Sequence, residues 1–176
     1  ERLPATLELA VAAACIALVG GLLMGVYTAL RRDGWLSQLL LTISLIGVSL
    51  PNFLIGILLI LAFAVSWQIL PSYGRGDVTM LGWWSTGLLT TSGLKALVLP
   101  AFTLSLYPMT LIMRLVRSEM LEVLRTDYIK FARARGLSNR AVHFGHALKN
   151  TLVPVLTITG LQLGSIIAFA IVTETV

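Results

Sequence analysis

Four long segments without a charged side chain dominate this sequence of 176 residues. They cover residues 9–30, 34–74, 96–113 and 151–173. An α-helix needs about 20 apolar residues to cross about 30 Å of hydrocarbon, so each segment is long enough to span a membrane, the third one barely. A transmembrane barrel would alternate apolar and polar residues, which these continuous segments do not do. The sequence therefore predicts an all-α integral membrane protein.

The second segment, residues 34–74, is about twice as long as one span requires. Pro51 near its middle predicts either one kinked helix or a tight helical hairpin. Basic residues concentrate on the cytoplasmic side of membrane proteins. One kinked helix places Arg31 and Arg32 on the same side as the basic loop 114–150, whereas a hairpin would separate them. The distribution of charge therefore favours a single kinked span.

The expected topology is a polytopic helical bundle that forms one domain over residues 1–176. Its four spans lie at about residues 9–30, 36–70 (kinked at Pro51), 96–113 and 151–173. Residues 114–150 form a cytoplasmic loop, and residues 71–95 form an outward loop that should be mostly irregular. Two glycine pairs have the spacing that lets helix backbones approach closely in membranes, Gly21 with Gly25 and Gly160 with Gly164.

The cytoplasmic loop has the pattern of two helices joined by a glycine turn. Apolar side chains recur at steps of three and four, at Leu121, Leu124, Tyr128 and Phe131. The third span either continues through this stripe or gives way to a new helix capped by Thr126 or Asp127. Gly136 is a natural helix stop, and Ser138 or Asn139 caps a second short helix. The residues alone leave two interpretations: a connector that binds anionic lipid, or a docking element for a partner.

Four segments of the sequence resemble those of a known family. They are "RLPATLELA" (2–10), "GVSLPNFLIGILLI" (47–60), "DYIKFARARGLSNRAVHFGHALKNTLVPVLT" (127–157) and "GLQLGSIIAFAIVTETV" (160–176). The chain resembles the inner-membrane permease subunits of binding-protein-dependent ABC importers, in the branch of dipeptide, oligopeptide and nickel permeases. The resemblance implies a type I ABC importer transmembrane domain, of which this chain is a piece with four of six spans. It also implies the cytoplasmic membrane of a bacterium or archaeon.

Such permeases carry a loop motif of Glu-Ala-Ala, three residues, Gly, nine residues and Ile-x-Leu-Pro. The chain matches this motif at Ala132, Gly136 and Leu148. It departs from the motif at Lys130, Phe131, His146 and Lys149, as the peptide branch does. Because the motif's Glu is missing, no role of that residue can be transferred to this chain.

The resemblance implies that the loop is a coupling helix that docks into a cleft on a cytoplasmic ATPase subunit. The expected apolar anchors are Tyr128, Phe131 and Leu137. The expected charged rim consists of Arg133, Arg135 and Arg140, around the motif residues Ala132 and Gly136. The other implied partners are a second homologous permease subunit, an extracytoplasmic solute-binding protein and membrane lipid. ATP and Mg would bind to the partner ATPase subunits.

The chain lacks the sequence signatures of an enzyme. It contains no GxxxxGK[ST] segment and no Ser, His and acid set placed for nucleophilic catalysis. His143 and His146 are spaced to share a metal, but no suitable third ligand lies nearby in the sequence. The chain is therefore expected to bind no metal or cofactor of its own. The net charge of +5 reflects the positive-inside bias, so no nucleic-acid partner is expected.

The predicted function is that of a permease subunit for a small solute, most simply a di- or oligopeptide. Candidate residues of its translocation pathway are Asn52, Gln162, Ser165 and Glu174. The alternative is a membrane receptor or scaffold whose basic loop binds some other cytoplasmic partner. An ion-coupled transporter is disfavoured, because the predicted spans contain no Asp, Glu or His.

Overall fold

The protein is a bundle of long helices. The computed structural model describes residues 3–72, 74, 76–81 and 84–175, and its account of side chains in the last helix ends at Gln162. The elements are α1 (Leu3–Leu30), α2 (Trp35–Ser49), α3 (Asn52–Ile60), π-helical η1 (Leu61–Ser66), β1 (Thr79–Leu81), β2 (Trp84–Thr86), α4 (Thr91–Val123), α5 (Asp127–Ala134), π-helical η2 (Ala141–Ala147) and α6 (Leu148–Thr175). The prediction of a helical membrane domain is confirmed, with one addition. The outward loop contains a small antiparallel hairpin, in which Thr79 of β1 faces Thr86 of β2.

The close packing of α1 against α4 forms the centre of the bundle. A side-chain carbon added at Gly21 would lie 2.8 Å from the Ile112 Cβ and 2.8 Å from the Met109 carbonyl oxygen. One added at Gly25 would lie 2.6 Å from the Val116 Cβ. All three distances are too short for a real carbon, so only glycine permits this approach. The first predicted glycine pair is thus a helix contact.

The second glycine pair has open space around it in the described part of the chain. A side-chain carbon at Gly160 or Gly164 of α6 would meet no described atom within 4 Å. Small residues other than glycine complete the contact face of α1 instead. They are Ala10, Ala13, Ala17 and Thr28, each at most 2 % exposed. Small side chains of this kind let neighbouring helices pack closely.

The second predicted span is broken sharply at Leu50 and Pro51. The axes of α2 and of the segment formed by α3 and η1 differ in direction by 108°. Leu50 and Pro51 both have extended backbone, because proline lacks an amide hydrogen and disfavours helical angles in the residue before it. Pro51 was predicted to bend this segment, but the observed break is sharper than the expected kink. The helical part also ends at Ser66, before the expected limit at residue 70.

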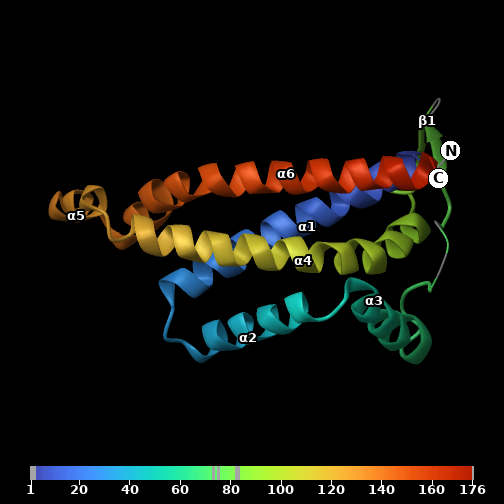
Figure 1. The fold of residues 1–176 in the computed structure, drawn as a ribbon, viewed down its shortest axis with the longest axis horizontal. Helices are drawn as coiled ribbons and strands as arrows, with labels where there is room; N and C mark the ends of the chain where they lie inside the picture. Colours follow the sequence, from blue (N-terminus) through green and yellow to red (C-terminus); the bar gives the residue numbers. More distant parts are fainter. Residues whose placement is uncertain (1–2, 73, 75, 82–83, 176) are drawn as a thin grey trace.

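The two ends of the bundle carry different parts of the chain (Figure 1). α1 begins and α6 ends at one end, beside the β hairpin. The connection between α1 and α2 lies at the opposite end, where α5 projects beyond the other helices. Arg31 and Arg32 therefore lie at the same end as the basic residues of α5, which is the arrangement that the single-span interpretation requires.

Candidate coupling site

The candidate site begins where α4 ends and the chain bends. α4 continues to Val123, ten residues beyond the predicted end of the third span at Met113. Thr126 has an extended backbone, and its hydroxyl donates a 2.7 Å hydrogen bond to the Val123 carbonyl oxygen. A new helix, α5, then starts at Asp127. An acid in the first turn of a helix is favoured by the helix dipole. Of the two alternatives, the structure has the fresh helix after a bend, with Thr126 at the N-cap position but without the predicted side-chain capping bond.

Gly136 ends α5 in a Schellman turn. Its φ of +81° lies in the left-handed region, which L residues with a side chain disfavour by about 1–2 kcal/mol. The Gly136 amide donates to the Arg133 carbonyl oxygen at 2.9 Å, and the Leu137 amide donates to the Ala132 carbonyl oxygen at 3.3 Å. These two bonds satisfy carbonyls that a helix end otherwise leaves unpaired. The predicted glycine stop is confirmed.

Ser138 caps the helix that follows the turn. Its hydroxyl oxygen accepts a hydrogen bond from the Ala141 amide at 3.3 Å, so Ser138, and not Asn139, is the capping residue. The expected second short helix is not a separate element. It passes through the π-helical η2 into α6, and Leu148 at the junction keeps right-handed helical angles. The span and the loop helix therefore form one continuous helical segment.

The inner face of α5 is fixed to the body of the protein. Ile129 is fully buried and Ala132 is 4 % exposed. Both belong to the same apolar cluster as Val142 and Ala147 of η2. Ala132, which the resemblance places among the coupling residues, therefore packs inside the chain. Ile129 was missed by the sequence reasoning, although its spacing of three from Ala132 marks a common helix face.

The outer face of α5 carries aromatic and basic side chains. Phe131 is 62 % exposed, Tyr128 is 49 % exposed, and Leu137 is 41 % exposed. The Arg135 guanidinium lies 5.7 Å from the centre of the Phe131 ring, within the range of a cation–π contact. The Tyr128 hydroxyl is 2.5 Å from Nδ1 of His146, which links α5 to η2. The remaining rim candidates, Arg133 and Arg140, are also exposed.

His143 of η2 lies close to the basic side of α5. Burial lowers the pKa of the His143 imidazole, and the positive charge of Arg133 lowers this pKa further. Both effects disfavour a second positive charge at this position. The site is thus electropositive at neutral pH, and His143 adds no charge to it.

A comparison with known families identifies the class of protein. A family model described as "Binding-protein-dependent transport system inner membrane component" matches residues 21–176. The chain belongs to this family. It is 44% identical to the "Di/tripeptide transport system permease protein DppB" of Pseudomonas aeruginosa (strain UCBPP-PA14), over 98% of the chain and 55% of that protein. The resemblance inferred from the loop is confirmed.

Other relatives are similar over the same extent. The chain is 38% identical to the "Dipeptide transport system permease protein DppB" of Alkalihalophilus pseudofirmus (strain ATCC BAA-2126 / JCM 17055 / OF4), over 99% of the chain and 56% of that protein. It is 38% identical to the protein of the same name from Bacillus subtilis (strain 168), over 97% of the chain and 50% of that protein. The chain spans about half the length of these curated relatives.

The two described pathway candidates of this inner membrane component, Asn52 and Gln162, lie apart in the chain. Asn52 is the exposed first residue of α3, and Gln162 is a half-buried residue of α6. In Figure 1, α3 and α6 lie on opposite sides of the central pair α1 and α4. The assignment of these residues to a pathway stays a prediction. The side chains of Ser165 and Glu174 lie outside the described residues.

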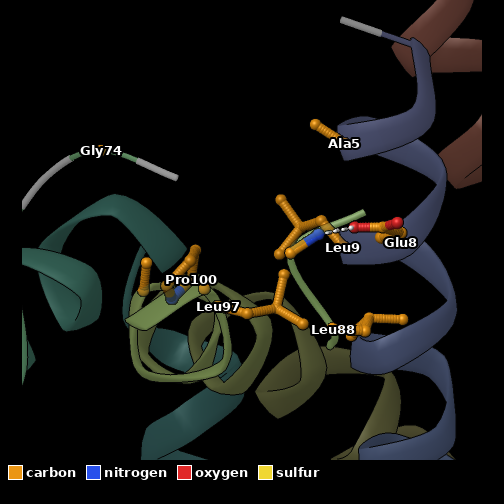
Figure 2. A pocket seen from close by; sticks show the side chains of 10 residues that line it. Ala5, Glu8, Leu9, Gly74, Leu88, Leu97 and Pro100 are labelled. Atoms are coloured by element: carbon orange, nitrogen blue, oxygen red, sulfur yellow. Dashed lines mark hydrogen bonds between the residues drawn. The ribbon is translucent and has the colours of Figure 1, made fainter. Parts of the chain in front are cut away.

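Two pockets of the inner membrane component lie near the outer hairpin, away from α5. The first, of about 190 Å³, opens between α1 and the start of α4, and Figure 2 shows Glu8, Leu9, Leu88 and Leu97 around it. The Glu8 carboxylate accepts a hydrogen bond from the Gly87 amide at 3.4 Å. The second pocket, of about 470 Å³, lies between α3 and α4, and Pro100 lines both pockets. The hairpin end of the membrane domain is therefore hollowed on two sides of α4.

A hydrogen bond joins the α4 extension to the end of α1. The Arg117 guanidinium donates to the Thr28 carbonyl oxygen at 2.5 Å. Thr28 lies in the last turn of α1, where carbonyls lack helical partners and a positive charge is favoured. Arg117 thus joins two helices. The sequence indicated only that it belongs to the basic loop.

Proposed function

We propose that this chain is the core of the permease subunit of an ATP-driven importer that moves di- or oligopeptides across the cytoplasmic membrane. Family membership supports the transport role. The names of the relatives, which are di/tripeptide and dipeptide permeases, support the solute class. Solute would arrive from an extracytoplasmic binding protein at the hairpin end, where both pockets lie. A second homologous permease subunit would complete the pathway, because one chain leaves its pathway candidates apart.

The observation that carries the proposal is the construction of α5. It is a short helix outside the bundle, fixed by buried Ile129 and by the Gly136 turn, with Phe131 exposed on its outer face. An apolar centre surrounded by a polar rim is the anatomy of a protein–protein interface. Its position at the end that carries Arg31 and Arg32 is the expected cytoplasmic side. We therefore assign α5 as the docking element for a cytoplasmic ATPase subunit.

The proposed mechanism transmits motion from the ATPase to the spans. ATP and Mg bind to the ATPase subunits, whose closure moves the cleft that holds α5. Reversing a population of inward-open and outward-open states from 1:99 to 99:1 requires about 5.5 kcal/mol of differential stabilisation. α5 can transmit a force of this kind because buried Ile129 and the Tyr128–His146 bond attach it to η2 and α6.

The test is uptake by a reconstituted transporter. The full-length permease carrying Phe131→Ala is placed in proteoliposomes with its companion permease, ATPase subunits and binding protein. Truncating a central aromatic anchor costs about 2 kcal/mol or more of binding free energy, which would reduce ATP-driven dipeptide uptake about 30-fold. Phe144→Ala on η2 is the matched control, because Phe144 is 50 % exposed but lies outside α5.

Each part of the proposal has its own refutation. Normal uptake by the Phe131→Ala transporter would refute the docking role of α5. ATP-driven uptake of another solute, with no uptake of peptides, would refute the solute assignment. A full-length protein that retains no ATPase subunit and transports nothing would support the receptor or scaffold alternative.

A further inference from the structure

The residues in and around α5 carry a large excess of positive charge. Residues 124–150 contain six basic residues and one acid, Asp127. The Lys130 ammonium lies 2.8 Å from the Asp127 carboxylate, so these two charges neutralise each other on the surface. Among the described residues, no acid pairs with Arg133, Arg135 or Arg140, which leaves three exposed guanidinium groups beside the turn. This surface therefore favours a negatively charged ligand.

The distance of α5 from the bilayer argues against lipid as that ligand. The charge-free part of α4 ends at Met113, and the ten residues from Arg114 to Val123 extend the helix by about 15 Å. The polar headgroup layer accounts for about 6 Å of this length. The remainder places the start of α5 beyond the headgroup layer. Figure 1 shows α5 as the outermost element at this end of the bundle.

The combination of arginines with an exposed aromatic ring indicates a protein surface. Guanidinium groups match carboxylates and phosphates alike in planar, two-point contacts, so the aromatic ring decides between a protein and a headgroup. Phe131, beneath the Arg135 guanidinium, supplies an apolar anchor that a free anion or headgroup would not need. We propose that α5 seats in a cleft with an apolar floor for Phe131 and carboxylates at the rim for Arg133, Arg135 and Arg140. This inference rests on the proposed docking of α5 to an ATPase subunit and specifies the chemistry of that subunit's cleft.

The test measures how much ATPase subunit the purified full-length permease retains at different salt concentrations. The double variant Arg133→Glu with Arg135→Glu should lower retention at least about tenfold at low salt, because it replaces attraction by repulsion. The deficit should shrink at about 1 M salt, where the Debye length is about 3 Å. The matched control is Arg31→Glu with Arg32→Glu, the same change of charge at the same end but on the α1–α2 connection.

The outcomes separate this inference from the proposed function. If Phe131→Ala lowers retention while the Arg133/Arg135 variant and added salt do not, α5 docks but its cleft is not acidic. If neither change affects retention, the docking of α5 is itself refuted. If the arginine variant instead loses only its binding to phosphatidylglycerol vesicles, lipid is the ligand and the inference is overturned. Restoration of binding by replacing the cleft carboxylates of the ATPase with lysine would confirm it.

Discussion

Substituting Gly136 tests whether the shape of the loop, apart from its chemistry, determines coupling. At φ of +81°, alanine would destabilise the turn by about 1–2 kcal/mol, which lowers the population of the correct turn about tenfold. Valine should be worse, since a β-branched side chain is a clear outlier at positive φ. Proline is worse still, because its φ is fixed near −65° and it lacks the amide that donates to the Arg133 carbonyl oxygen. A side-chain carbon added at Gly136 would have no described atom within 4 Å, so the expected effect comes from the backbone conformation and not from a clash.

The assay is the amount of dipeptide taken up for each ATP hydrolysed by the reconstituted full-length transporter. We expect this ratio to fall in the order Gly, Ala, Val, Pro, with membrane insertion unchanged. Gly145→Val is the matched control, because Gly145 also has open space around it but has no positive φ. If Gly136→Val couples as well as Gly145→Val does, the left-handed turn is not required and the reasoning fails.

Two further predictions concern stability. Gly25→Ala should destabilise the purified protein by about 1–3 kcal/mol, because the new carbon would meet Val116 in the α1–α4 contact; Gly160→Ala, on an open face of α6, should have no such effect, and equal thermal midpoints for the two variants would contradict the packing. Folding lowers the pKa of His143, so the unfolded state takes up the proton more readily than the folded state does. The contribution of His143 to stability is therefore complete above its ordinary pKa of about 6.5 and is lost as the pH falls through its folded-state pKa. His143→Gln should make the thermal midpoint less dependent on pH in this range. An unchanged pH dependence would argue against the burial of His143 beside Arg133.

The sequence predicted those features that depend on local physical chemistry. The charge-free segments located the helices, and Gly136 and Ser138 located the turn, because each of these signals acts within a few residues. Pro51 located the break between α2 and α3 for the same reason. The angle of that break was not predictable, since proline interrupts a helix without determining the direction in which the chain continues.

Features set by tertiary packing could not be predicted. Gly21–Gly25 and Gly160–Gly164 have the same spacing, yet among the described residues only the first pair meets another helix. In α5, the apolar stripe through Tyr128 and Phe131 faces outward, while Ile129 and Ala132 form the buried face. Both stripes have helical spacing, and only the position of η2 decides between them.

These contacts indicate which parts of the protein move together when α5 is displaced. α5 is attached to η2 through buried Ile129, and η2 continues into α6. α4 is attached to α1 along the Gly21–Gly25 contact and through the Arg117–Thr28 hydrogen bond. The segment of α2, α3 and η1, in contrast, is interrupted by extended backbone at Leu50 and Pro51. We therefore expect a force on α5 to move α1, α4 and α6 as one unit, with the Leu50–Pro51 break as the hinge that absorbs the change.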